Sequence, residues 1–142
     1  MTEAVNAALA RRWFEEVWNE RRNATVRELV RADAVGHLEG VIVRGPDEFL
    51  EIRSSLPGAF PDIQLKVEDV VAQGDQVVVR WAAKATHKGN QLGIAATDRS
   101  VAFRGMTWLR FADGLIVEGW DAWNQGALLN ELRAEAPLQG TA

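Results

Sequence analysis

Residues 101–123, VAFRGMTWLRFADGLIVEGWDAW, decide the fold class predicted for this chain. Two largely apolar runs of strand length, 101–111 and 115–123, flank an Ala-Asp-Gly sequence at 112–114. An Asp-Gly pair between two such runs is typical of a tight β-hairpin turn, because both residues tolerate a positive φ angle. The stretch therefore predicts two long strands joined as an antiparallel hairpin.

The residues upstream of this hairpin continue the strand pattern. Another strand is predicted for 77–86, and apolar and polar residues alternate over 63–67. A Gly-Asp pair at 74–75 predicts the turn between these two segments. We therefore expect an antiparallel meander after residue 61.

The first 60 residues have helical periodicity instead. Thr2 is the expected N-cap of a long first helix, a capping-box pattern at 25–28 predicts a short second one, and Gly-Pro-Asp-Glu at 45–48 predicts the start of a third. Three N-terminal helices before a meander indicate an α+β fold, with the helices on one face of a strongly curved, mostly antiparallel sheet. The side chains expected to be buried are Val5, Leu9, Trp13 and Val17 in the first helix and Phe49, Ile52 and Leu56 in the third.

Composition bounds the chemistry that this chain can perform. Its 142 residues are 47% hydrophobic with a net charge of −4, which suits one domain spanning 1–142. The absence of cysteine excludes a thiol nucleophile, a disulfide and a cysteine zinc site, and the absence of tyrosine excludes a phenol donor. The slight acidity argues against nucleic acid as a partner. Without an apolar run of 18 residues or a basic leader, we expect no membrane association and a cytoplasmic protein.

Strand alternation predicts which side chains face the interior. Apart from Asp121, the charged residues share one parity in each strand, and the opposite parity is almost entirely apolar. The inward set is expected to include Trp81 and, if its strand continues, His87; then Phe103 and Thr107; and finally Val117, Asp121 and Trp123. Trp108 and Trp120 have the outward parity, which would suit the interface of a homodimer or homotetramer.

Asp121 is the one carboxylate on this predicted apolar face. A buried aspartate costs free energy unless it is paired, hydrated or functional. Desolvation would raise its pKa and make it a competent general base near neutral pH. Parity alone supports this role and a structural one, such as pairing with an arginine, about equally.

Several stretches together resemble the SnoaL-like polyketide cyclases, or ester cyclases, of the nuclear transport factor 2-like superfamily. The resemblance implies a cone-shaped α+β barrel around a deep apolar pocket. It also implies ring closure of a polyketide-derived, hydrophobic substrate by an aldol-type reaction that uses neither a metal nor an organic cofactor. The matching stretches are RRWFEEVWNERR, DAVGHLEG, GPDEF, FPDIQLKVEDVVAQGDQVVVRW, THKGNQLGI and FRGMTWLRFADGLIVEGWDAWNQGALLNEL.

The resemblance also implies roles for individual residues. In the cyclases that typify the family, an aspartate in the last long strand acts as acid and base, and Asp121 matches it. His37 matches a histidine commonly found at the pocket mouth, and it is the second candidate catalytic residue. Asn124 stands where many members have a second acid. The residues expected to contact substrate are Trp81, Trp123, Asn124, Phe103, Thr107 and His87.

Other interpretations stay open at this point. His37 alone reads as a loop histidine, His87 as an exposed strand-end residue, and Glu39 as a solvated loop acid or a partner of His37. The sequence disfavours an epoxide hydrolase or an isomerase of the same fold, because the catalytic aspartates of those enzymes are missing. Thr107 stands where the isomerase acid would be. Another cofactor-free enzyme, such as a hydroxylase accessory or an epoxide-opening or pericyclic cyclase, or a non-catalytic small-molecule-binding module would keep the same pocket.

Overall fold

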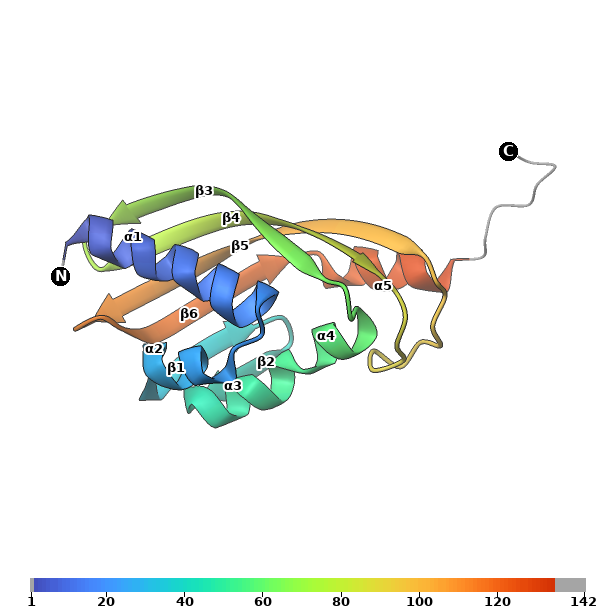
Figure 1. The fold of residues 1–142 in the computed structure, drawn as a ribbon, viewed down its shortest axis with the longest axis horizontal. Coiled ribbons are helices and arrows are strands. Elements are labelled where there is room, and N and C mark those ends of the chain that lie inside the picture. Colours follow the sequence, from blue (N-terminus) through green and yellow to red (C-terminus); the bar gives the residue numbers. More distant parts are fainter. Residues whose placement is uncertain (1, 135–142) are drawn as a thin grey trace.

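A six-stranded sheet and the helices packed against it make up the computed structural model, which describes residues 2–134 (Figure 1). The strands are β1 (Val30–Leu38), β2 (Val41–Arg44), β3 (Gln64–Gln73), β4 (Gln76–Thr86), β5 (Ser100–Ala112) and β6 (Leu115–Trp123). The helices are α1 (Glu3–Arg12), the π-helical η1 (Trp13–Asn19), α2 (Asn23–Leu29), α3 (Gly45–Arg53), α4 (Ser55–Ala59) and α5 (Gln125–Arg133).

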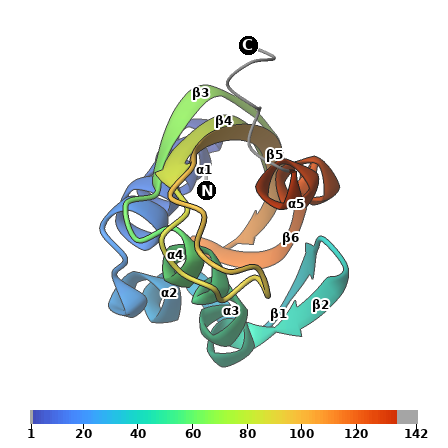
Figure 2. The same ribbon diagram turned by 90° about the vertical axis from the view of Figure 1, so that its right-hand side faces the viewer.

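The strand order is β2-β1-β6-β5-β4-β3, and neighbouring strands are antiparallel except for the parallel pair β1 and β6. The sheet curves around α1, which contacts β3 and β4 on the concave side (Figure 2). The α+β prediction, with helices on a curved, mostly antiparallel sheet, is therefore confirmed. The sequence analysis did not predict β1, β2, α4 and α5.

The β5–β6 hairpin forms where it was predicted. Asp113 and Gly114 adopt φ angles of 52° and 78°, as a tight turn of this kind requires. One register shift follows Arg110, so that Phe111 pairs with Ile116. Ile116 therefore joins the main core cluster, whereas the predicted Val117 is buried outside it.

The first helix begins as predicted, and two of its four predicted inward residues, Trp13 and Val17, are buried. The Thr2 hydroxyl accepts a hydrogen bond from the Val5 amide at 3.1 Å, yet the Val5 side chain is 40% exposed. Successive four-residue steps rotate by roughly 40° around a helix of about 3.6 residues per turn, so the predicted stripe is exposed at Val5 and reaches the core only at Trp13 and Val17. The buried side chains on this segment are Asn6, Ala10, Trp13, Phe14 and Val17.

The second helix is present, but its predicted capping box is wrong. Thr25 lies inside α2, and its hydroxyl donates to Glu16 at 2.7 Å instead of capping the helix. Glu28 accepts from Arg12 at 2.8 Å. Thr25 and Glu28 therefore join α2 to the preceding helices and do not cap its N-terminus. The third helix starts with Gly45 and Pro46, as predicted.

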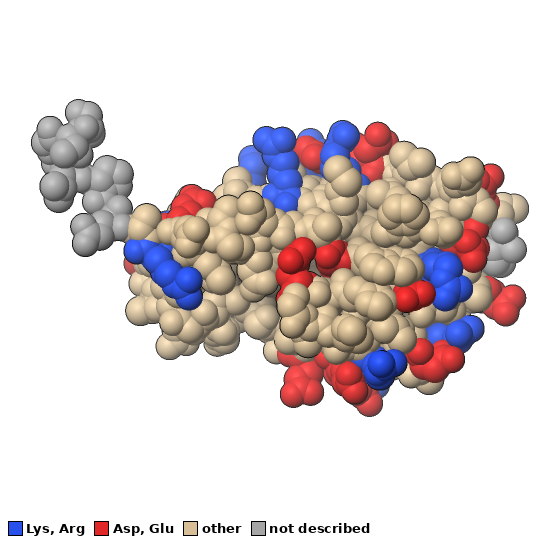
Figure 3. Space-filling model, turned by 180° about the vertical axis from the view of Figure 1, so that it is seen from behind, with Lys and Arg blue, Asp and Glu red and all other residues tan. Residues whose placement is uncertain are grey.

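Charge is spread over the surface in both signs. On the side seen in Figure 3, the lysines and arginines of the described residues form small groups with acidic side chains beside them. That face therefore lacks the continuous basic area typical of nucleic-acid-binding proteins. No helix within residues 2–134 is long and apolar enough to cross a bilayer.

Candidate active site

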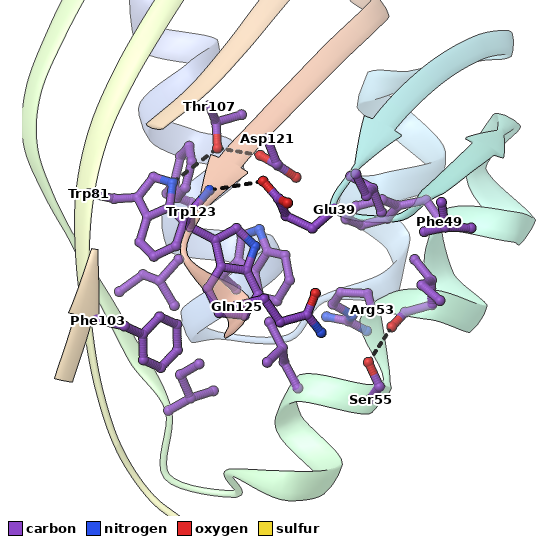
Figure 4. Close-up of a pocket in the computed structure, with 18 of the residues that line it drawn as sticks. Glu39, Phe49, Arg53, Ser55, Trp81, Phe103, Thr107, Asp121, Trp123 and Gln125 are labelled. Atoms are coloured by element: carbon purple, nitrogen blue, oxygen red, sulfur yellow. Dashed lines mark hydrogen bonds between the residues drawn. The ribbon is translucent and has the colours of Figure 1, made fainter. Parts of the chain in front are cut away.

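A cavity of about 150 Å³ lies between the inner face of the sheet and helices η1, α3 and α4 (Figure 4). Its walls are mostly aromatic and aliphatic, with Trp18, Phe49, Leu56, Trp81, Phe103 and Trp123 among them. Its polar side chains are those of Glu39, Arg53, Ser55, Thr107, Asp121 and Gln125. The predicted helix residues Phe49, Ile52 and Leu56 line this space; Phe49 and Leu56 also pack against the core, whereas Ile52 is 37% exposed.

Asp121 is held by a chain of two hydrogen bonds from neighbouring strands. The Trp81 indole N–H donates to the Thr107 hydroxyl at 3.0 Å, and that hydroxyl donates to Oδ1 of Asp121 at 2.5 Å. Because Thr107 receives the indole proton, its own proton points toward the carboxylate. Among the described residues, none donates a hydrogen bond to the other oxygen, Oδ2. The carboxylate is thus fixed through one oxygen while the other stays available to a ligand.

Gly105 lets two of the tryptophan walls meet over β5. It pairs with Trp81 on one side and with Trp123 on the other. A Cβ atom at position 105 would lie 2.4 Å from Cζ2 of Trp81 and 2.7 Å from Cβ of Trp123. Phe103 extends this aromatic wall, with its ring centroid 5.2 Å from that of Trp123. Only glycine leaves room for this arrangement, which also brings the Trp81 N–H to Thr107.

Burial raises the pKa of Asp121 to about 6. The hydrogen bond from Thr107 acts in the opposite direction, and the negative charge of Glu39 adds to the rise. A carboxylate with such a pKa is largely ionised at neutral pH and holds an abstracted proton more tightly than an exposed aspartate does. Asp121 therefore has the proton affinity of a general base.

Glu39 lines the cavity, although the sequence suggested a solvated loop acid or a partner of His37. It follows β1 in the turn to β2, and its Oε1 accepts a hydrogen bond from the Trp123 amide at 3.2 Å. The last residue pair between β1 and β6 is His37 with Trp120, so the Glu39 side chain continues the contact between these strands. Its carboxylate lines the cavity near Asp121 (Figure 4).

Arg53 lines the cavity, but its guanidinium is hydrogen-bonded to neighbouring helices. Its guanidinium donates to the Val17 carbonyl at 2.7 Å and to Oδ1 of Asn23 at 2.5 Å. Burial lowers its pKa from the ordinary value. These contacts join α3 to η1 and α2, so the main role of Arg53 is to hold the helices beside the cavity.

The model of the SnoaL-like polyketide cyclase family matches residues 8–132. The chain belongs to this family. Structures of similar proteins agree with the fold. A protein of Jannaschia sp. CCS1 assigned as a SnoaL-like polyketide cyclase has a TM-score of 0.88 at 23% identity, with 94% of this chain and 95% of that chain covered.

Two Streptomyces proteins are more similar to this SnoaL-like chain in sequence. AclR of Streptomyces galilaeus, assigned as a hydroxylase, is 29% identical, with a TM-score of 0.82 and coverage of 98% of this chain and 88% of that one. IdmH of Streptomyces antibioticus, assigned as a polyketide cyclase, is 29% identical, with a TM-score of 0.79 and coverage of 91% and 99%. No curated protein matches the chain significantly.

The cavity of this SnoaL-like domain brings together five of the predicted site residues. Asp121, Trp81, Trp123, Phe103 and Thr107 all line it. They lie on β4, β5 and β6 with the parity that the strand pattern predicted. Within residues 2–134, no group of three or more histidine, aspartate or glutamate side chains could hold a metal ion.

His37 lies away from the cavity, so its predicted place at the pocket mouth is wrong. Its Nε2 is 2.8 Å from Oε2 of Glu118, and its ring stacks on Trp120 with centroids 5.4 Å apart. Glu118 also accepts from Arg110 at 3.2 Å, and its pKa is lowered by these two partners. Pairing between β1 and β6 turns His37 toward the face of the sheet that carries these residues.

Asn124 does not line the cavity either, because it caps a helix. Its side-chain oxygen accepts from the Ala127 amide at 2.8 Å at the start of α5. The residue that lines the cavity is the next one, Gln125. Asparagine just before an apolar-periodic segment is a common N-cap signal, so the sequence does contain a sign of this helix.

His87 is buried, which contradicts its interpretation as an exposed strand-end residue. Its ring centroid lies 5.6 Å from that of Phe60, and its Nδ1 accepts from the Thr97 amide at 3.2 Å. His87 is absent from the lining of the cavity, contrary to its predicted role in substrate binding. It packs against Phe60, and its hydrogen bond from Thr97 holds the segment that follows β4 in place.

Proposed function

We propose that this SnoaL-like chain is a cofactor-independent polyketide cyclase. It would close a ring in a hydrophobic, polyketide-derived substrate by an intramolecular aldol reaction, with Asp121 as acid and base. The observation that supports this most strongly is the buried Asp121 carboxylate, fixed through Oδ1 by Thr107 and facing an apolar cavity. Family membership supports the reaction class.

In the proposed reaction, Asp121 transfers one proton twice. Its carboxylate removes a proton from a carbon between two carbonyl groups, which leaves an enolate. That carbon attacks a ketone carbon of the same molecule, the new carbon–carbon bond forms, and the ketone oxygen becomes an alkoxide. The alkoxide takes the proton back from Asp121, which restores the carboxylate. A carbon flanked by two carbonyls is already acidic, so one positioned base is sufficient.

Gln125 is the proposed donor to the developing enolate oxygen. It lines the cavity, and its side chain makes no hydrogen bond to another side chain within residues 2–134. The Trp81 indole N–H is already used by Thr107, so it is not free for the substrate. An amide directed at a developing negative charge stabilises the transition state more than the ground state.

The aromatic walls supply the conformational part of catalysis. The rings of Trp81, Phe103 and Trp123 form one continuous surface beside Asp121. A flexible chain folded against this surface loses its freedom before the reaction, and positioning of this kind contributes up to about 7 to 11 kcal/mol in favourable cases. The cavity would therefore select the ring that forms.

Replacing Asp121 by asparagine tests the proposal. Asp121→Asn is expected to keep the fold and ligand binding but to lower turnover of a linear tetraketone such as nonane-2,4,6,8-tetraone by roughly 10²–10⁴-fold, the usual contribution of a general base. In this chain the carbon between the first two carbonyls can attack the last ketone and close a six-membered ring. Asp113→Asn, the same change in the exposed β5–β6 turn, is the matched control and is expected to be fully active. Equal turnover by the wild-type and Asp121→Asn proteins would reject the proposal.

A hydroxylase is the second candidate, and the similarity to AclR favours it. Dependence on dioxygen separates the two reactions, because an aldol ring closure consumes no oxidant. Turnover that stops under anaerobic conditions would support hydroxylation, whereas unchanged anaerobic turnover would support the cyclase.

We further propose that the chain acts in the cytoplasm as a homodimer formed through the outer face of the sheet. Met106, Trp108 and Trp120 are exposed on this face at 53%, 47% and 37%. The charged groups beside them, Arg110 and Glu118, pair with each other at 3.2 Å within one copy, so this face adds no net charge to oppose the approach of a second copy related by a twofold axis. Sedimentation of Trp108→Glu as a monomer, with Val5→Glu on α1 as control, would support this interface; an unchanged dimer would reject it.

A further inference from the structure

A second, smaller cavity of about 50 Å³ adjoins the main one. It lies between η1 and α3 on one side and strands β1, β5 and β6 on the other. Five residues line both cavities: Trp18, Leu38, Phe49, Thr107 and Asp121. Asp121 therefore lies where the two spaces meet, and a ligand that reaches its carboxylate has room on both sides.

The two cavities differ in chemical character. Glu39, Arg53, Ser55 and Gln125 line only the main cavity. The side chains that line only the smaller one are apolar, with Trp13, Ala34, Val43, Leu109 and Ile116 among them. Apart from the shared Thr107 and Asp121, no charged or hydroxyl side chain of the described residues lines it. An apolar space beside a carboxylate favours a hydrocarbon group over water.

We infer that the smaller cavity is a subsite for a short alkyl substituent of the substrate. The inference rests on the proposed function, because it places the reacting carbon at Asp121. The short end group on one of its two carbonyls then enters the smaller cavity, and the rest of the carbonyl-bearing chain occupies the main cavity. One water-sized group needs roughly 10–15 Å³ of such space, so the subsite holds roughly three to five non-hydrogen atoms. The cyclase would thus favour substrates with a propyl- to pentyl-sized end group over those with a methyl group or a long chain.

Two residues offer opposite ways to change the size of the subsite. Ala34 and Val43 are both buried and line only the smaller cavity. Ala34→Leu adds volume and fills it, whereas Val43→Ala removes volume and enlarges it. Neither residue takes part in the hydrogen bonds by which Trp81 and Thr107 hold Asp121. Changes at these positions therefore act on the subsite and leave the carboxylate in place.

The test measures binding of acetylacetone and of homologues in which one methyl group is replaced by an ethyl, propyl, pentyl or heptyl group. Titration calorimetry needs no turnover, so it reads the subsite independently of catalysis. For the wild-type protein we expect affinity to rise about fourfold per added CH₂ until the subsite is full, and then to stop rising. Ala34→Leu should remove this gain. Val43→Ala should move the best chain to a longer one.

Ala102→Leu, the same change at an exposed position of β5, is the control and should match the wild-type series. Thermal unfolding of each variant confirms that it is folded; if Ala34→Leu does not fold, Val43→Ala still tests the subsite through its longer optimum. Acetylacetone binding without a chain-length gain, or a gain that neither variant alters, would overturn this inference alone. Absence of binding by every member of the series would overturn the proposed function with it.

Discussion

Thr107 and Asp121 face each other directly across β5 and β6, and the threonine hydroxyl donates to the carboxylate at 2.5 Å. The hydroxyl is itself oriented by the Trp81 indole N–H. In isomerase relatives the position of Thr107 is expected to hold the acid, whereas here it holds the donor that fixes an acid on the next strand. The position of this carboxylate is thus fixed by three adjacent strands.

Thr107→Val is expected to raise the pKa of Asp121, because the hydrogen bond that lowers it is lost. The same change leaves the Trp81 N–H without its partner, which costs about 1–3 kcal/mol of folding free energy. Thr107→Ser keeps the hydroxyl and is the control. Carbon-13 NMR titration of the Asp121 carboxyl and urea unfolding check both effects; an unchanged pKa in the valine variant would contradict the role of the hydroxyl.

Asp121 itself is expected to reduce stability above pH 6. Its pKa is about 6 in the folded protein and near 3.8 when exposed, so the folded state binds the proton more tightly. Folding stability from this group is therefore full below about pH 4, falls as the pH rises to about 6, and stays low above that. The loss is of the order of 3 kcal/mol.

Urea unfolding of the wild-type and Asp121→Asn proteins between pH 4 and 8 checks this directly. The asparagine variant should gain stability over the wild type as the pH rises through this window, and Asp113→Asn should show no such trend. If the difference in free energy of unfolding between the two proteins does not vary with pH, ionisation of Asp121 does not destabilise the fold.

Glu39→Gln is expected to lower the pKa of Asp121, because it removes the negative charge that adds to the rise. The amide oxygen can still accept from the Trp123 N–H, so the β1–β2 hairpin should keep its place. The acid limb of the pH–rate profile should move to lower pH, and the carboxyl titration should move with it. Glu51→Gln, on the exposed side of α3, is the control. A profile identical to the wild type would show that Glu39 does not act on Asp121.

Strand alternation was sufficient to find the residues of the central strands. Asp121, Thr107 and Trp123 lie on long, regular strands, where each side chain's direction follows from its parity and needs no knowledge of distant partners. The same local rule placed Trp81 and Phe103. This is why the wall and the carboxylate could be predicted from residues 77–123.

The residues that were misplaced depend on contacts between distant segments. The orientation of His37 is decided by the parallel pairing of β1 with β6, and β1 carries only one buried apolar residue, Ala34, by which to recognise it. Asn124 is used by a helix cap and His87 by the segment after β4. Glu39 reaches the cavity only because the β1–β2 turn lies beside β6, which no local pattern reveals.

Gly105→Ala should disrupt the aromatic wall and the hydrogen bonds to Asp121 together. The added Cβ would lie 2.4 Å from Cζ2 of Trp81, 2.7 Å from Cβ of Trp123 and 2.9 Å from the Ala122 carbonyl oxygen. The backbone carbonyl on β6 cannot move without disturbing the sheet, so Trp81 is the group expected to shift. Its N–H would then lose the Thr107 hydroxyl, and the carboxylate would lose its orientation.

We expect Gly105→Ala to lower the free energy of unfolding by about 1–3 kcal/mol, the usual cost of overpacking. It should also change the tryptophan fluorescence and reduce turnover even at temperatures where the variant is folded. Gly126→Ala is the control, since its nearest neighbour would lie 3.7 Å from the added Cβ and alanine favours the helix there by up to about 1 kcal/mol. Wild-type turnover with unchanged fluorescence in Gly105→Ala would show that the wall tolerates a methyl group. Wild-type turnover with changed fluorescence would show that Trp81 does not orient the acid through Thr107.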